Sequence, residues 1–321
     1  MTPRDCTRCN NNGIVYHRAY SGEYLCRNCF LFSIEDKTKR CVNKYSMLRY
    51  QDKVAVAVSG GKDSLSLLYI LNKIYGEKDY INIIAVTIDE GIPGYRDESL
   101  EIAKHFCSKI GIENRVLKFG DVFGINMDEL LSNRPSEKTS SCSFCGTFRR
   151  RALDLISESV GARVVATGHN LDDQLQTFLI NILSGDVERI GWIYPEPVEY
   201  GEKNIKKIKP FVEIYEHELV FYALQRGIPF QAEECPHKNE SIRTDIRNFL
   251  NSLESNHPGI KYNAFNSAIK ISKLLKMEIP GSLTKKICSL CGRDSSSSVC
   301  SVCKNLMILS RAKSYNVQKS D

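Results

Sequence analysis

The chain has 321 residues, of which 42% are hydrophobic and 26% are charged, a composition typical of a soluble globular protein. This length allows one large α/β core with small appendages, or two domains. No apolar run approaches the roughly 18 to 20 residues of a membrane span, and the polar start MTPRDCTRCNNNG contains no signal core. We therefore expect a cytoplasmic protein without membrane segments.

The net charge is weak evidence about partners. The formal value of +6 suggests a polyanionic partner. If eight of the 13 cysteines bind two Zn²⁺ ions as thiolates, the net charge falls to about +2, because eight negative and four positive charges are added. Local basic patches, rather than the total charge, must therefore indicate a nucleic acid.

Pairs of cysteines mark both ends of the chain. Each end carries two C-x2-C pairs, a spacing typical of zinc sites. In a reducing compartment such clusters favour a metal over disulfides, and a site closed by four thiolates is structural. At the N-terminal end, bound metal would supply the folding energy that so short a stretch lacks. The predicted zinc ligands are Cys6, Cys9, Cys26, Cys29, Cys288, Cys291, Cys300 and Cys303.

Strand and helix patterns alternate from about residue 50 to 215. The run VAVAV (54–58) is continuous, apolar and rich in valine, as in a buried parallel strand, and the helical pattern after it ends at Gly76. Further strands are predicted at 82–88, 114–119 and 163–167, and further helices at 97–111 and 171–185. This order predicts an α/β fold, a doubly wound and mainly parallel sheet with helices on both faces.

The segments from 213 to 278 carry apolar stripes with helical spacing. We therefore divide the chain into four parts. They are an N-terminal zinc finger over 1–45, a catalytic domain over 46–215, a helical extension that completes it over 216–282, and a C-terminal zinc finger with a tail over 283–321.

The turn SGGKDS (59–64) joins the first buried strand to its helix. Ligands of parallel sheets bind beyond the carboxyl ends of the strands, and two glycines let a ligand approach the backbone there. The free N–H groups of the new helix favour phosphate. The pattern is neither G-x-x-x-x-G-K-S/T nor G-x-G-x-x-G, which excludes the common GTPase loop and the dinucleotide fingerprint. A plain strand-to-helix turn is the alternative.

With this turn the sequence resembles the PP-loop, or N-type, ATP pyrophosphatases. In that family the loop S-G-G-x-D-S holds the pyrophosphate of ATP, and the enzymes adenylate an oxygen of their substrate. The segment ATGHNLDDQLQT (166–177) is similar to a later loop of the family. The resemblance implies that Gly168 approaches the nucleotide and that Asp173 lies beside Mg²⁺ and the reacting phosphate. The alternative for Asp172 and Asp173 is capping of a helix N-terminus.

A third cysteine pair, in the middle of the chain, is incomplete. Cys142 and Cys145 precede three arginines, and no second pair lies nearby. Cys107 adjoins an apolar helical stripe and is interpreted as core packing, Cys41 is uninformative, and Cys235 lies in a polar turn that could present a ligand. Three thiolates permit zinc with an open position, an iron–sulfur cubane with one free iron, or redox dithiol chemistry.

Taken together, the motifs resemble the archaeal and eukaryotic cytosolic tRNA 2-thiolation enzymes, a group that includes the thermophile enzyme acting on the T-loop uridine. The cysteine knuckles at both ends, SGGKDS, CSFCGTFRRRALD, ATGHNLDDQLQTFLINILSGD and ECPH cover nearly the whole chain in the order of that family. The resemblance implies that Cys142, Cys145 and Cys235 hold a 4Fe-4S cluster whose fourth iron binds hydrosulfide. A persulfide on one cysteine, resolved by a second, is the alternative mechanism.

The same resemblance implies adenylation of a uridine C2 oxygen followed by sulfur transfer, with ATP, Mg²⁺, a 4Fe-4S cluster and two Zn²⁺ ions. The wobble uridine is the expected target, and the T-loop uridine is the alternative. Expected partners are tRNA, a sulfur donor that is a ubiquitin-like carrier or sulfide, and a second copy of the chain in a homodimer. The implied ATP site contains Ala57, Val58, Ser59, Gly60, Gly61, Lys62, Asp63, Ser64, Ile88, Gly168 and Asp173, and the implied catalytic residues are Cys142, Cys145, Cys235, Asp63, Asp173 and Arg149.

Two groups of basic residues are candidates for contacts with phosphate or RNA. If Cys142 and Cys145 open a helix, Arg149 shares their face. We predict that Arg149 contacts phosphate or the adenylated intermediate, while Arg150 is left without a definite role. The alternative is that the three arginines form a solvated or RNA-backbone patch. The segment EKNIKKIKP (202–210) is interpreted as a contact with the tRNA backbone.

Two other classes stay open. Another PP-loop enzyme, such as a tRNA lysidine synthetase or a cytidine 2-thiolase, would share the ATP motifs, and iron content distinguishes the lysidine enzyme because its chemistry needs no cluster. A zinc-ribbon RNA-binding scaffold without catalysis would share the terminal cysteines, but the intact SGGKDS loop argues against it.

Overall fold

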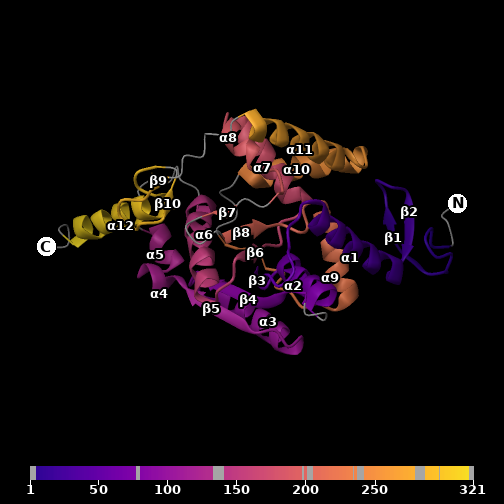
Figure 1. Cartoon of the computed structure of the whole chain (residues 1–321), viewed down its shortest axis with the longest axis horizontal. Coiled ribbons are helices and arrows are strands. Elements are labelled where there is room, and N and C mark those ends of the chain that lie inside the picture. Colours follow the sequence, from indigo (N-terminus) through magenta and orange to yellow (C-terminus); the bar gives the residue numbers. More distant parts are fainter. Residues whose placement is uncertain are drawn as a thin grey trace.

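The computed structural model describes residues 5–76, 80–132, 141–196, 199–200, 205–233, 235–236, 242–278, 286–295 and 297–317. Its centre is a six-stranded sheet of order β5-β4-β3-β6-β8-β7, in which β7 runs antiparallel to β8 and the other neighbours are parallel (Figure 1). The strands are β3 (Lys53–Ala57), β4 (Asn82–Asp89), β5 (Asn114–Lys118), β6 (Val164–Ala166), β7 (Glu199–Tyr200) and β8 (Ile205–Ile208). The predicted mainly parallel sheet is therefore confirmed.

The two faces of the sheet bury separate parts of the core. Along β3, Val54 and Val56 belong to one apolar cluster and Ala55 to the other, because successive side chains of a strand point to opposite faces. The first cluster contains residues of α1 (Arg27–Lys44), α2 (Lys62–Tyr75), α3 (Tyr95–Lys109), α7 (Leu171–Leu183) and α9 (Glu216–Arg226). The second contains residues of α4 (Phe119–Phe123), α5 (Met127–Ser132), α6 (Ser141–Ser159) and α12 (Ser301–Val317). Helices thus cover both faces, as predicted.

The strand order reverses at β3. The chain adds β4 and β5 on one side of β3, and then crosses over to add β6 and β8 on the other side. Where two successive connections leave in opposite directions, a crevice opens at the carboxyl edge of a parallel sheet. The turn after β3 and the loop after β6 both leave the sheet at this reversal, which makes it the expected ligand site.

A layer of helices lies beside the sheet. In Figure 1, α7, α8 (Val187–Gly191), α10 (Ile242–Asn256) and α11 (Ile260–Glu278) lie together at the top. Helix α11 contacts both α7 and α8, and Phe178, Ile190, Ile193 and Ala268 form a small apolar cluster among them. The sequence interpretation of 213–278 as mostly helical is confirmed.

A cysteine-rich hairpin attaches to the sheet through α1. Strands β1 (Ile14–Arg18) and β2 (Glu23–Cys26) are antiparallel and lead directly into that helix. Arg18 of β1 is 1% exposed, and its Nε donates to Oε1 of the fully buried Glu218 of α9 at 2.7 Å. A buried ion pair therefore links the N-terminal module to the α/β core.

The C-terminal cysteines lie at the other end of the molecule. Strands β9 (Lys286–Ile287) and β10 (Asp294–Ser295) form a second antiparallel hairpin, and α12 follows and contacts α6. Figure 1 shows the two cysteine-rich modules at opposite ends of the long axis. No helix among the described residues is long and apolar enough to cross a membrane. The proposed boundaries between the four parts stay a prediction.

One segment differs from its interpretation. The lysine-rich stretch 202–210 contains β8, which lies between β6 and β7, and Lys206 is buried there. Lys207 Nζ lies 2.7 Å from Asp154 Oδ1 of α6. Lys203 falls outside the described residues. A continuous tRNA-backbone contact along this stretch is therefore wrong for Lys206, because an inner strand turns alternate side chains into the protein.

Candidate active site and metal centres

The predicted nucleotide turn leaves β3 and begins α2 at the carboxyl edge. Gly60 has φ of +83°, and a Cβ there would lie 2.4 Å from the Ser99 carbonyl oxygen, so glycine is required. The backbone N–H of Ser59 donates to Ser64 Oγ at 3.1 Å, and Ser64 Oγ donates to the Gly61 carbonyl at 2.9 Å. Helix α2 begins after Gly61 without a side-chain cap. Its first N–H groups therefore suit an anionic ligand.

Three more residues predicted for the ATP site lie at the ends of strands. Ala57 ends β3, and the backbone N–H of Val58 donates to the Val86 carbonyl at 2.8 Å. Ile88 is buried near the end of β4, and its carbonyl accepts a hydrogen bond from Arg96. Their positions at the carboxyl edge agree with the prediction, and their contact with ATP stays a prediction.

The loop after β6 packs directly on the turn after β3. A Cβ on Gly168 would lie 2.9 Å from the carbonyl carbon of Asp63 and 3.0 Å from the backbone nitrogen of Ser64. Asn170 Nδ2 donates to Asp63 Oδ2 at 3.4 Å. The structure thus brings together two motifs that are far apart in the sequence, and it does so through backbone contact that requires glycine at 168.

Asp63 lies among both cations and carboxylates. Lys62 Nζ is 3.3 Å from Asp63 Oδ2 and 3.0 Å from Glu216 Oε1. Asp63 Oδ1 is buried and has no hydrogen-bond partner in the described part of the chain. The pKa of Asp63 is raised to about 7, mainly by burial, with Asp173 and Glu216 also raising it and Lys62 opposing them. An unpartnered carboxylate oxygen beside a second carboxylate fits a divalent cation such as Mg²⁺.

The two aspartates at the start of α7 have separate roles. Asn170 caps α7, accepting from the backbone N–H of Asp173 at 3.0 Å, while Asp173 Oδ2 accepts from the backbone N–H of Asn170 at 3.1 Å. Buried Asp172 accepts from the backbone N–H of Glu216 at 2.7 Å and from Lys261 Nζ. The capping alternative is confirmed for Asp173. A cation role remains compatible, because a carboxylate accepts several bonds.

Glu90, just after β4, connects α6 to the sheet edge. It is 2% exposed, and its carboxylate oxygens lie 2.6 Å from Arg149 Nη2 and 2.7 Å from Arg96 Nε. Arg96 Nη1 also donates to the Ser59 carbonyl at 3.0 Å. The predicted shared face is confirmed for Cys145, because Arg149 Nη2 lies 3.5 Å from Cys145 Sγ. Sequence reasoning missed Glu90 and Arg96, although Glu90 stands directly beyond a predicted strand.

The central cysteines gather around the start of α6. Cys145 and Cys235 both pack against the second apolar cluster, and Cys142 lies in the first turn of α6 with its side chain outside the described part. Burial raises the pKa of Tyr95, and the Cys235 thiol raises the same pKa further. The pKa of Arg149 is raised mainly by Glu90, and Cys145 and Tyr95 add to that effect. The structure therefore brings Cys145 and Cys235 to one region, and their cluster ligation stays a prediction.

The two remaining cysteines are packed into the core. Cys107 is 1% exposed and Cys41 is fully buried. Burial raises the pKa of the Cys107 thiol to about 11. Such thiols are inert at neutral pH, so the interpretation of Cys107 as core packing is confirmed.

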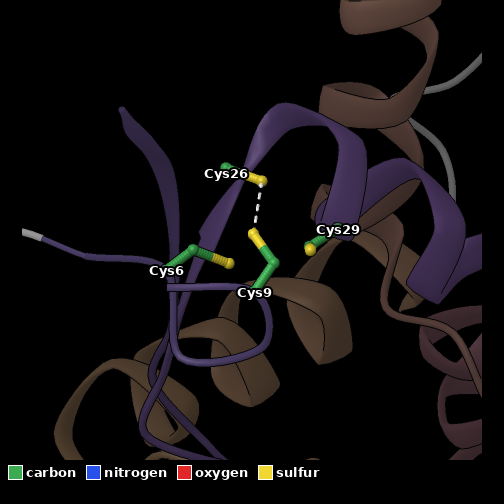
Figure 2. Close-up of side chains that lie close together, drawn as sticks. All are labelled: Cys6, Cys9, Cys26 and Cys29. Atoms are coloured by element: carbon green, nitrogen blue, oxygen red, sulfur yellow. Dashed lines mark hydrogen bonds between the residues drawn. The ribbon is translucent and has the colours of Figure 1, made fainter. Parts of the chain in front are cut away.

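The terminal quartets have the geometry of tetrahedral metal sites. In each quartet the four Sγ atoms lie within 4.8 Å of one another, and Figure 2 shows how the N-terminal four converge. The Sγ atoms of Cys9 and Cys26 are 3.7 Å apart, and those of Cys291 and Cys300 are 3.8 Å apart. A zinc–sulfur bond of about 2.3 Å places tetrahedral ligands about 3.8 Å apart. Both quartets therefore fit Zn²⁺.

The thiols of the C-terminal quartet differ in acidity: the pKa of Cys288 is lowered, whereas burial raises that of Cys303. The backbone N–H of Cys300 lies 3.3 Å from Cys288 Sγ. This hydrogen bond is the main reason that the pKa of Cys288 falls to about 6, against the opposing effect of burial. Because metals bind the deprotonated thiol, a pKa below 7 lets a metal bind without displacing a proton from Cys288 at neutral pH.

Comparison with known proteins agrees with this geometry. The family model of the PP-loop domain matches residues 32–254. A cytoplasmic tRNA 2-thiolation protein 1 of Chlamydomonas reinhardtii is 34% identical over 97% of this chain and 86% of that protein. A tRNA-5-methyluridine(54) 2-sulfurtransferase of Pyrococcus horikoshii is 35% identical over 89% and 88%. The U34-tRNA thiolase NcsA of Methanococcus maripaludis, solved with its 4Fe-4S cluster, has a TM-score of 0.81 at 33% identity over 95% and 96%.

The chain belongs to the PP-loop family of tRNA 2-thiolation proteins. The resemblance drawn from the motifs is thereby confirmed, as is the expectation of a tRNA sulfurtransferase. The comparisons leave the position of the target uridine undecided, because relatives named for uridine 34 and for uridine 54 are similar to the chain at nearly the same identity.

In this PP-loop protein, two further side chains reach the carboxyl edge. Lys209 directly follows β8, and its Nζ donates to Gln174 Oε1 at 3.4 Å. His169 Nδ1 lies 2.8 Å from Thr167 Oγ1. Desolvation lowers the pKa of Lys209 to about 8 and that of His169 to about 4, and Asp173 acts on both in the opposite direction. Sequence reasoning assigned neither residue a role: His169 stands inside the predicted loop 166–177 beside Gly168, and Lys209 follows β8, which was not recognised as a strand.

Proposed function

We propose that this chain is an ATP-dependent tRNA-uridine 2-thiolase. The proposal is carried by the meeting of three parts at one sheet edge: the turn after β3, the loop after β6 and the start of α6. Gly168 packs on the backbone of Asp63, and the 2.6 Å ion pair between Arg149 and Glu90 holds α6 at the same edge. Backbone donors for phosphate, carboxylates for a cation, and thiols therefore lie at one edge of the sheet.

The turn after β3 binds ATP in this proposal. The uncapped N–H groups of α2 and the ammonium of Lys62 hold the pyrophosphate, and Asp63 with Asp173 would hold Mg²⁺. A cation bound there supplies charge neutralisation for the departing pyrophosphate. The uridine C2 oxygen attacks the α-phosphorus as the N3 proton leaves, and the oxygen becomes part of a phosphate leaving group.

The thiols of α6 and the 235 turn serve the second half of the reaction. Cys142, Cys145 and Cys235 would hold a 4Fe-4S cluster, whose contribution is an iron free to bind sulfide. The sulfur nucleophile attacks C2, AMP leaves with the former carbonyl oxygen, and a proton returns to N3. Arg149, fixed by Glu90 beside Cys145, is placed to neutralise the phosphate of the adenylated base.

The wobble uridine is the proposed target. The proposal rests on the solved U34-tRNA thiolase, which matches 95% of this chain at a TM-score of 0.81. The proposal extends to a cytoplasmic location, two structural Zn²⁺ ions, a homodimer, and a sulfur donor that is a ubiquitin-like carrier or sulfide.

A thiolation assay tests the proposal. Anaerobically prepared protein is incubated with ATP, sulfide and tRNA transcripts in which uridine 34 or uridine 54 is replaced by cytidine. We expect AMP and 2-thiouridine in equal amounts, both lost when uridine 34 is replaced. Loss only on replacement of uridine 54 would transfer the target to the T-loop. Failure to form AMP with any tRNA would overturn the proposal and support a non-catalytic RNA-binding scaffold.

Metal analysis of the same preparations distinguishes the cluster from a persulfide. We expect about four irons per chain, and none in Cys235→Ser. Full activity in an iron-free preparation would support persulfide transfer instead. One observation favours that second route: the contact of 3.5 Å between Arg149 Nη2 and Cys145 Sγ, which stabilises a nucleophilic thiolate.

A further inference from the structure

The three consecutive arginines of α6 have different partners. Arg149 pairs with Glu90, and Arg150 Nη2 donates to Thr147 Oγ1 at 3.4 Å. Arg151 reaches out of the helix to the C-terminal quartet, with Nη1 3.5 Å from Cys291 Sγ and Nη2 3.7 Å from Cys300 Sγ. One guanidinium therefore contacts two thiols, one from each C-x2-C pair of that quartet.

Further contacts hold the C-terminal module along α6. Arg293 donates to both carboxylate oxygens of Glu158 at 2.8 and 2.9 Å, a two-bond geometry that fixes orientation as well as distance. Val302 and Leu309 of α12 are buried in the same apolar cluster as Phe148 of α6. The module thus contacts α6 by charge near its C-terminal end, by apolar packing in its middle, and by Arg151 between them.

The positive charge of Arg151 complements the negative charge of a metal-loaded C-terminal quartet. Four thiolates around one Zn²⁺ carry a net charge of −2, and a guanidinium with N–H groups directed at two of the sulfurs offsets half of it. At the N-terminal quartet, no arginine or lysine donates to a thiol in the described part of the chain, so the two quartets differ in this respect.

We propose that Arg151 is an outer-sphere partner of the C-terminal metal site, and that the occupied site holds α6 in the position that the central cysteines need. Arg151 is a positioning residue and touches no reacting atom. When the quartet holds no metal, its sulfurs are no longer fixed in one tetrahedron, so the guanidinium loses the fixed acceptors of its two contacts and the module is held less firmly against α6. The second half of the inference rests on the proposed function, since it concerns the iron held by Cys145 and its partners.

Zinc release tests the first half. Protein with both zinc sites loaded is mixed with an excess of a chromophoric chelator, and the release of two zincs per chain is followed in time. We expect Arg151→Ala to release one of them about tenfold faster than the unaltered protein and the other at an unchanged rate. Arg151→Lys should lie between, and Arg150→Ala, the neighbouring arginine without a quartet contact, should behave like the unaltered protein. Equal release from Arg151→Ala and the unaltered protein would overturn the inference.

Iron retention tests the coupling to α6. Cys300→Ser, which opens the C-terminal quartet, and Cys26→Ser, which opens the N-terminal one, are reconstituted anaerobically, and iron per chain is measured. We expect iron loss to be several-fold faster in Cys300→Ser than in Cys26→Ser. Equal iron retention in the two variants would overturn the coupling.

A milder change covers the case in which Cys300→Ser fails to fold. Glu158→Gln weakens the second attachment of the module and leaves all ligands intact, so it should accelerate iron loss without lowering the zinc content; unchanged iron loss would contradict the coupling. The outcomes remain separate from those of the proposed function. If the unaltered protein binds no iron and forms no AMP, the proposed function fails while the zinc-release result still decides the role of Arg151.

Discussion

The surroundings of Asp63 determine the protonation state of its carboxyl group. Its carboxylate is desolvated beside Asp173 and Glu216, and burial raises its pKa to about 7. A carboxyl group with this pKa is half protonated in neutral solution before any ligand binds. A bound cation must then displace a proton, so the affinity for MgATP becomes linked to pH.

We therefore expect the Kd for MgATP to rise by up to about tenfold for each pH unit below 7, and to level off above pH 8. Titrations with a fluorescent ATP analogue at pH 6, 7 and 8 measure this dependence. Asp63→Asn has no proton to displace there and should bind weakly with a flat profile. A flat profile in the unaltered protein would contradict the assignment.

The same shift predicts a stability effect. The folded pKa of Asp63 lies above the unfolded value of about 3.9, so the favourable contribution of this group is complete below pH 4 and is lost as pH rises through 7. In the absence of ligand, Asp63→Asn should raise the Tm at pH 8 relative to the unaltered protein, and raise it much less at pH 5. Differential scanning calorimetry at the two pH values checks the sign, and a Tm difference independent of pH would contradict it.

Lys209 and Lys207 provide a matched pair at the end of β8. Lys209 lies near Asp173 at the crevice, whereas Lys207 pairs with Asp154 of α6. We expect Lys209→Ala to lower kcat/KM for tRNA thiolation by about 10²-fold, because it removes a fixed cation from the site of charge development. Lys207→Ala should change kcat/KM by less than about twofold, since a partly exposed ion pair contributes little. Equal effects of the two variants would assign Lys209 a structural role.

Contact between elements decides whether the ATP site forms. The loop after β6 reaches the first turn of α2 only because Gly168 has no Cβ, which would lie 2.9 Å from a backbone atom of Asp63. Gly191 of α8 has no neighbour closer than 3.8 Å to an added Cβ and serves as the control position.

Gly168→Ala is expected to weaken ATP binding by at least about tenfold, because neither backbone can give way like a flexible side chain. The Kd for ATP, measured by calorimetry, should be unchanged in Gly191→Ala. Normal ATP affinity in Gly168→Ala would show that the two loops can separate without affecting ATP binding. Their contact would then no longer support the proposed function.

The N-terminal module depends on another contact between elements. Arg18 and Glu218 are both buried; Arg18 also pairs with Glu23, but removing the Glu218 carboxylate takes one of its two carboxylate partners from Arg18 and the carboxylate partner from Lys37. We expect Glu218→Gln to lower the free energy of unfolding by about 3–5 kcal/mol, measured by urea denaturation with metal bound. Asp36→Ala, which removes an exposed pair with Arg40 on α1, should cost about 0.5 kcal/mol or less. Equal costs would show that the buried pair adds no particular stability.

At the scale of the whole molecule, the arrangement is a sheet with a four-cysteine module at each end of the long axis (Figure 1). The two modules attach differently. The N-terminal module contacts α9 through a buried ion pair and contributes to the first apolar cluster. The C-terminal module contacts α6 and contributes to the second apolar cluster. Loss of metal should therefore affect different parts of the active site from the two ends.

The motifs and most of the elements could be predicted because their signals are local. The apolar runs of β3 and β4, the glycine turn at 59–64 and the C-x2-C spacings each lie within a few residues of one another. Strand β8 was missed because its four residues include two lysines, one of which the sheet buries. A short strand supported by its neighbours carries too little periodicity of its own to be recognised.

What the amino-acid order alone determined is the inventory: an α/β sheet, a phosphate turn, two four-thiol sites and an incomplete third. Which of these groups meet was decided by the tertiary structure. The pairing of Arg149 with Glu90, the packing of Gly168 on Asp63 and the reach of Arg151 to Cys291 depend on strand order and on how α6 lies across the sheet. Local spacing carries no record of those contacts, because each joins residues from separate elements whose meeting follows from the packing of the whole core.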